Sequence, residues 1–175
     1  MPKLIVLFHA ADGAAAALAE NAAAGARGVR FTEIDVRALG DTESSGGERQ
    51  RRLESADQLR DYDGVAVACS GDKVPKELSR LFDDLERAPA KSFVNTVFTL
   101  VGPEQATLLT RVVRLGAILV SPPPGADEPG ARAAAAGARA AKVVAWIRHA
   151  QSHEQHDHEQ HDHEHHHHHD QHPPA

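Results

Sequence analysis

Apolar residues in the first part of the chain gather in short runs, and longer segments with a helical period separate these runs. Residues 4–8 and 65–68 are continuously apolar, which is typical of strands that are buried on both faces of a parallel sheet. Residues 29–36 alternate between polar and apolar side chains, so this segment is predicted to be an edge strand. Two further strands are predicted at residues 92–100 and 117–120.

Helices are predicted between and after these strands. The alanine-rich segment 14–26 favours a helix through intrinsic propensity, and in segment 75–87 the large apolar residues share one helical face. Segments 104–115 and 131–149 are predicted to be helical on the same grounds. Alternating strands and helices predict one α/β domain over residues 1–149, with helices on both faces of a parallel sheet.

The order of these elements and several short segments resemble a known group of proteins. The segments are residues 4–8 with the turn at Gly13, residues 59–64 (Leu-Arg-Asp-Tyr-Asp-Gly), residues 74–83 (beginning Val-Pro-Lys-Glu-Leu) and residues 115–120 (Leu-Gly-Ala-Ile-Leu-Val). Along most of residues 3–148 the chain resembles the flavodoxin-like fold. More narrowly, it resembles the tryptophan-repressor-binding-protein type of NAD(P)H:quinone oxidoreductase. The resemblance implies a three-layer α/β sandwich whose five-stranded parallel sheet has the order 2-1-3-4-5.

The resemblance also implies a site for flavin mononucleotide (FMN) outside the carboxyl ends of the strands, at the topological switch point. Three loops would form it: the first would bind the phosphate with backbone N–H groups at a helix N-terminus, and the second would lie beside the isoalloxazine ring. In such a protein the flavin carries the chemistry, so we name no catalytic residue. The implied FMN-binding residues are His9, Ala10, Ala11, Asp12, Gly13, Ala14 and Ala15, then Cys69, Ser70, Gly71, Asp72 and Lys73, then Leu100, Val101 and Gly102.

These loops also depart from the family that they resemble. Alanines stand at positions 10, 15 and 17, where the family usually has Ser or Thr, and the acidic side chain of Asp12 would repel phosphate. Each lost charge-assisted hydrogen bond costs about 1.5–3 kcal/mol. None of the three loops contains Trp or Tyr to stack on a flavin. Two interpretations therefore stay open: an FMN-binding redox protein, or a flavodoxin-like body that no longer binds FMN.

Two residues in these loops have alternative interpretations of their own. Cys69 could be a reactive thiol with Lys73 nearby, but a lone Cys at the end of a strand is more often a small buried hydrophobe. His9 could contact phosphate or a metal ion, but an ordinary polar histidine at the rim of the sheet is the favoured interpretation.

Residues 150–175 form a histidine-rich segment, which contains six acidic residues and almost no apolar ones. Such a segment cannot bury enough surface to offset its ordering entropy, so we expect it to be disordered. Imidazole suits Ni, Cu, Zn and Co, and acidification releases these ions because only the neutral ring binds. The predicted metal ligands are His153, His156, His158, His161, His163, His165, His166, His167, His168, His169 and His172.

The charge balance excludes some classes of partner. Outside the histidine-rich segment, 19 acidic residues balance 19 basic ones, so no basic footprint for nucleic acid or an anionic membrane is evident. No apolar run is long enough to span a bilayer, and a single cysteine excludes an internal disulfide. We expect a cytoplasmic protein, and the resemblance leaves a homo-oligomer open. Two functions compete: an FMN oxidoreductase that uses NAD(P)H and quinone, and a protein that binds, stores or delivers metal ions.

Overall fold

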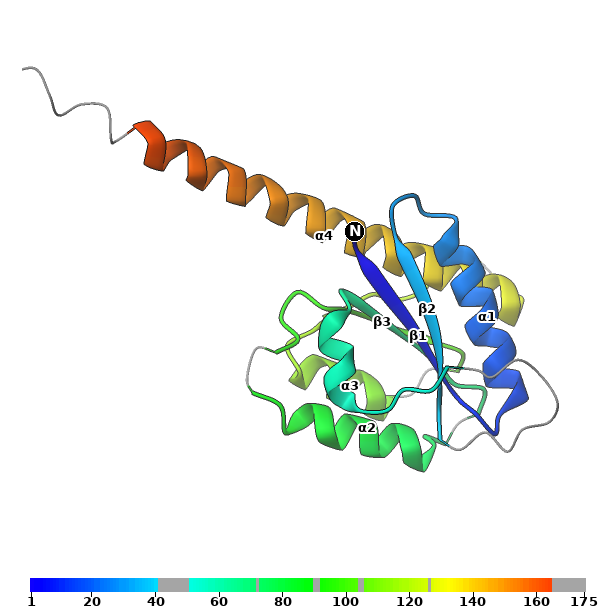
Figure 1. Ribbon diagram of the computed structural model, residues 1–175. Helices are drawn as coiled ribbons and strands as arrows, with labels where there is room; N and C mark the ends of the chain where they lie inside the picture. Colours follow the sequence, from blue (N-terminus) through cyan, green and yellow to red (C-terminus); the bar gives the residue numbers. More distant parts are fainter. Residues whose placement is uncertain (41–50, 72, 90–91, 104–105, 126, 165–175) are drawn as a thin grey trace, which may run out of the picture.

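The computed structural model describes residues 1–40, 51–71, 73–89, 92–103, 106–125 and 127–164. In this part of the chain, five parallel strands form one sheet in the order β2-β1-β3-β4-β5 (Figure 1). The sheet order is the one that the family resemblance implies. The strands are β1 (Lys3–His9), β2 (Glu33–Leu39), β3 (Gly64–Ala68), β4 (Val97–Val101) and β5 (Ile118–Leu119).

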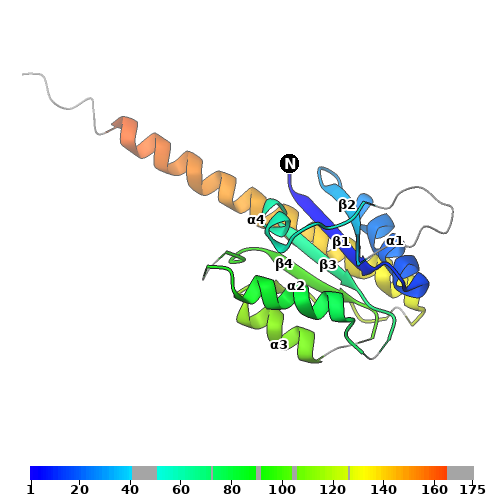
Figure 2. The ribbon, with the colours of Figure 1, turned by 60° about the horizontal axis from the view of Figure 1, so that its bottom comes forward.

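Helices cover both faces of the sheet (Figures 1 and 2). Helices α1 (Gly13–Arg27) and α4 (Pro129–Glu164) pack on one face, and α2 (Lys76–Glu86) and α3 (Ala106–Arg114) pack on the other. A short 3-10 helix, η1 (Ala56–Asp61), precedes β3. The parallel α/β sandwich and its sheet order confirm the predicted fold class.

Strand β1 shows why its sequence is apolar without interruption. Leu4 and Val6 are buried against α1 and α4, whereas Ile5 and Leu7 are buried against the α2 and α3 side. Successive side chains of a strand point to opposite faces, so a central strand with helices on both sides needs apolar residues at every position.

Helices α1 and α4 approach each other until their backbones touch. A Cβ atom added at Gly25 would lie 1.9 Å from the carbonyl oxygen of Ala134, and one added at Gly137 would lie 2.0 Å from that of Ala22. Only glycine fits at these two positions. The alanine-rich sequences of both helices therefore serve close packing as well as helix propensity.

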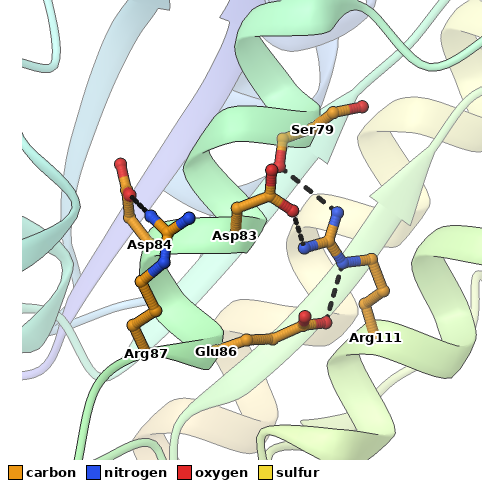
Figure 3. A network of polar contacts seen from close by, with 6 residues as sticks. All are labelled: Ser79, Asp83, Asp84, Glu86, Arg87 and Arg111. Atoms are coloured by element: carbon orange, nitrogen blue, oxygen red, sulfur yellow. Dashed lines mark hydrogen bonds and ion pairs between the residues drawn. The ribbon is translucent and has the colours of Figure 1, made fainter.

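Helices α2 and α3 are joined differently, through larger side chains and one arginine (Figure 3). From α3, Arg111 donates hydrogen bonds to Glu86 at 2.7 Å and to Asp83 at 2.6 Å, and its guanidinium lies over the Phe82 ring. A third donation, to the Ser79 carbonyl oxygen at 3.2 Å, completes the network. The hydrogen bond from Arg111 lowers the pKa of Glu86. This face is therefore tied together by charge as well as by apolar contact.

Two strands begin well after their predicted starts. Strand β2 begins at Glu33 rather than at residue 29, and β4 begins at Val97 rather than at residue 92. In both cases a residue with positive φ precedes the strand: Phe31 (62°) and Asn95 (72°). A left-handed residue interrupts an extended chain, and hydrophobic periodicity does not detect it.

Helix α4 gives a larger correction. The predicted helix ends at His149, whereas α4 continues to Glu164. The physical reason is local: Ala, Glu and Gln are good helix formers, and no Gly or Pro lies between residues 138 and 164. The disorder expected for the histidine-rich segment as a whole stays a prediction. Residues 165–175 lie outside the described residues. None of the helices described here is both long and apolar enough to cross a membrane.

Candidate functional site

Asp12 organises the loop between β1 and α1. It is the N-cap residue of α1, and its carboxylate accepts hydrogen bonds from the backbone N–H groups of Ala14 at 3.1 Å and Ala15 at 3.0 Å. The other carboxylate oxygen accepts a hydrogen bond from the Ser70 hydroxyl, which belongs to the loop after β3. One side chain therefore caps the helix and joins two of the three loops that the resemblance assigns to FMN.

The carboxylate of Asp12 is charged at neutral pH. The hydrogen bond from Ser70 lowers its pKa most, and those from Ala15 and Ala14 lower it further. A phosphate group would need these same N–H groups and would meet a negative charge beside them. The alanines at positions 10 and 15 offer no hydroxyl in compensation. The residues present do not fit an FMN phosphate at the start of α1.

The loop after β3 begins with Cys69, which is buried. Its N–H donates to the carbonyl oxygen of Val101 at 2.9 Å. Burial, with a smaller contribution from Asp12, raises the pKa of the Cys69 thiol to about 11. The thiol is therefore protonated at neutral pH, which favours the buried hydrophobe over the reactive thiol. Asp72 lies outside the described residues, and Lys73 is exposed.

His9, at the end of β1, contacts helix α2, which packs on the face of the sheet opposite α1 and α4. Its Nε2 atom lies 3.1 Å from a carboxylate oxygen of Glu77, in the first turn of α2. About a quarter of the His9 side chain is exposed. This geometry favours the rim histidine over a ligand for phosphate.

The loop after β4 packs directly on the end of β3. Gly102 has a φ of +114°, and a Cβ atom there would lie 1.8 Å from the carbonyl oxygen of Cys69. Backbone touches backbone at this point. Gly102 is therefore required for the approach of the second loop to the third.

A cavity of about 510 Å³ lies beside these loops, between α1 and the start of α4. Alanine, proline, leucine and valine side chains form most of its wall, and the polar side chains on it are Asn21, Ser70, Asp127 and Arg132. This size and lining are typical of small-molecule sites. Of the residues that the resemblance assigns to FMN, those that the structure places on this cavity are Ala14, Ser70, Val101 and Gly102.

The predicted metal ligands are described in part. Among them, His153 has a described side chain, and its Nε2 atom lies 3.2 Å from Nε2 of His149. His149 is not among the predicted ligands; its four-residue spacing from His153 identifies the pair once the helix is known to continue past residue 149. Among the residues whose side chains are described, no group of three or more His, Cys, Asp or Glu side chains could hold a metal ion.

Comparison with known proteins finds similarity in structure. No protein-family model matches the chain, and no curated protein does. Flavodoxin 1 of Bacillus cereus is 19% identical with a TM-score of 0.56, over 80% of this chain and 97% of that one. An archaeal flavodoxin is 18% identical with a TM-score of 0.56, over 81% and 98%.

A third solved structure is the diflavin flavoprotein A3 of Nostoc sp., which is 15% identical with a TM-score of 0.57, over 86% of this chain and 97% of that one. Each similarity extends over nearly the whole of the other chain, and the observed strand order is that of flavodoxins. The chain therefore has the flavodoxin-like fold.

Proposed function

We propose that this protein binds, stores or delivers late transition-metal ions through its histidine-rich C-terminal segment, with the flavodoxin-like body as a scaffold. The observation that carries the proposal is where the histidines lie. Eleven of the 13 histidines fall within residues 153–172, and helix α4 carries the start of this segment away from the sheet (Figure 1). Imidazole at this density suits Ni, Cu, Zn or Co.

The start of α1 supports the scaffold role. For a phosphate to bind there, the Asp12 carboxylate would have to leave the N–H groups of Ala14 and Ala15 and the hydroxyl of Ser70. Hydrogen bonds to a charged group contribute about 1.5–3 kcal/mol each. The binding free energy of a phosphate would first have to offset the loss of these hydrogen bonds.

The cavity between α1 and α4 favours a second candidate function. An FMN-dependent redox protein, of the NAD(P)H:quinone oxidoreductase type, would place its ligand close to the loops that line this cavity. Such a protein would have to hold FMN without phosphate contacts to the N–H groups at the start of α1, because Asp12 accepts their hydrogen bonds. Metal binding is the better supported of the two proposals.

Isothermal titration with Ni²⁺ and with Zn²⁺ tests the metal proposal. The 175-residue chain is compared with a variant of the same length in which the eleven predicted histidine ligands are replaced by glutamine, which favours helix but does not bind these ions. We expect the natural chain to take up more than one ion and the variant to lose this uptake. Equal uptake by the two chains would contradict the proposal.

A flavin titration separates the two candidate functions. We expect the purified protein to be colourless and the fluorescence of added FMN to be unchanged. A yellow protein, or quenching that saturates at one FMN per chain, would support the redox function instead.

A further inference from the structure

The geometry points to a metal site at His149 and His153, formed by the folded part of α4. The two histidines lie one turn apart on the helix, and both are exposed. Their Nε2 atoms are 3.2 Å apart, and the ring planes are nearly perpendicular, with centroids 4.5 Å apart. This inference rests on the proposed function and specifies where the first ion binds.

The separation of the two nitrogen atoms matches that of two imidazoles on one ion. Zinc–nitrogen bonds measure about 2.0–2.1 Å. Two such nitrogens are then about 2.9 Å apart at a right angle and about 3.4 Å apart at the tetrahedral angle. The observed 3.2 Å lies between these values. The two nitrogens are therefore already spaced as two ligands of one ion would be, and rotation of the rings about their side-chain bonds would direct both lone pairs at it.

The helix is anchored to the body next to this pair. Arg148 forms an ion pair with Asp63 at 2.7 Å, and Val144 is buried one turn earlier. The Ser152 hydroxyl donates a hydrogen bond to the carbonyl oxygen of His149 at 2.7 Å. The two imidazoles are thus presented by an ordered helix, so binding an ion requires little further ordering of the chain.

Binding of an ion changes which ring nitrogen of the pair carries a proton. Between two neutral rings this contact is a hydrogen bond only when one ring carries its proton at Nε2 and donates it to the Nε2 of the other. An ion needs both Nε2 lone pairs, so the donating ring moves its proton to Nδ1 by exchange with water. Water molecules or carboxylates would complete the coordination.

The test isolates the pair within the 175-residue chain. In a pair variant, glutamine replaces the ten predicted histidine ligands other than His153, so His149 and His153 remain. We expect this variant to bind one Ni²⁺ by isothermal titration. His149→Gln in the same background should lower the affinity at least tenfold, because one of two ligands is lost.

A spacing control keeps the number of histidines constant. In the pair variant, Gln151→His with His153→Gln places the two histidines two residues apart, where their side chains point about 200° apart around the helix. We expect the same loss of affinity as with His149→Gln. Electron paramagnetic resonance of one equivalent of Cu²⁺ should show two coordinated imidazole nitrogens in the pair variant and one in each of the other two.

The outcomes separate the two proposals. If the natural chain takes up several ions but the pair variant binds Ni²⁺ no better than its His149→Gln form, the site at His149 and His153 is overturned while the proposed function stands. If the natural chain takes up no metal, the proposed function fails, and this site fails with it.

Discussion

At the start of α1, two backbone N–H groups and a hydroxyl from another loop all donate to the carboxylate of Asp12. Along α4, the imidazoles of His149 and His153 face solvent, and each ring contacts the other. Both places carry groups that bind ligands in other proteins. At the start of α1 the chain itself supplies the hydrogen-bond partners of these groups, whereas on α4 the groups stay accessible to a ligand.

This difference separates stability from binding. Groups that are satisfied within the chain contribute to the free energy of unfolding, and a ligand has to displace an existing partner before it binds there. Groups that face solvent contribute little to folding and remain available to an ion. Changes at the α1 end should therefore alter stability, and changes at the α4 end should alter metal uptake.

The largest effect is expected at Gly102, which holds the loops after β3 and β4 together. Gly102→Ala places a Cβ atom 1.8 Å from the Cys69 carbonyl oxygen, at a φ of +114°. We expect the free energy of unfolding to fall by about 2–4 kcal/mol in urea denaturation. Gly13→Ala is the matched control, because its Cβ atom would meet nothing within 4 Å. An equal loss in both variants would refute the role of close backbone contact.

A smaller effect is expected at Asp12. Asp12→Ala removes the N-cap and leaves the Ser70 hydroxyl without its acceptor, so the free energy of unfolding at pH 7 should fall by about 0.5–2 kcal/mol. Asp12→Asn keeps a capping oxygen and should lose less. Urea denaturation of the three chains measures the difference. An alanine variant more stable than the natural chain would show that the hydrogen bonds to the Asp12 carboxylate do not stabilise the fold.

The contribution of Asp12 should also depend on pH. Because its folded-state pKa is lowered, its charge stabilises the fold fully above the unfolded-state value of about 3.9. That contribution is lost as pH falls through the folded-state pKa. The stability gap between the natural chain and Asp12→Ala should therefore be constant near neutrality and narrow in acid. A gap that widens in acid would be inconsistent with a lowered pKa.

The fold follows from sequence patterns that depend on burial. The continuous apolar run 4–8 has to be a central strand, and the shared face of Leu78, Leu81 and Phe82 has to pack against the sheet. Such patterns extend over many residues, so they identify the elements even where single boundaries shift. The boundaries at Phe31 and Asn95 depend on single backbone angles, which leave no pattern.

The candidate sites depend on contacts between distant residues. From the sequence, Asp12 is expected to repel phosphate, whereas in the structure it caps α1 and accepts a hydrogen bond from Ser70. These residues are 58 positions apart, and no local pattern predicts their hydrogen bond. The pairing of His149 with His153 is local, but it depends on a helix that continues past His149. Past His149 no pattern of buried residues marks the helix, so its continuation has to be predicted from helix propensity alone.

The smallest effect on stability is expected at the His149–His153 pair on α4. Replacing both His149 and His153 with glutamine should change the free energy of unfolding of the metal-free protein by less than about 0.5 kcal/mol, because both side chains are exposed and their contact is with each other. Urea denaturation in the presence of a chelator measures this. A loss above about 1 kcal/mol would mean that the pair supports the fold, and the contrast with Asp12 would then fail. An unchanged stability together with weaker uptake of the first ion places the function of the pair in binding.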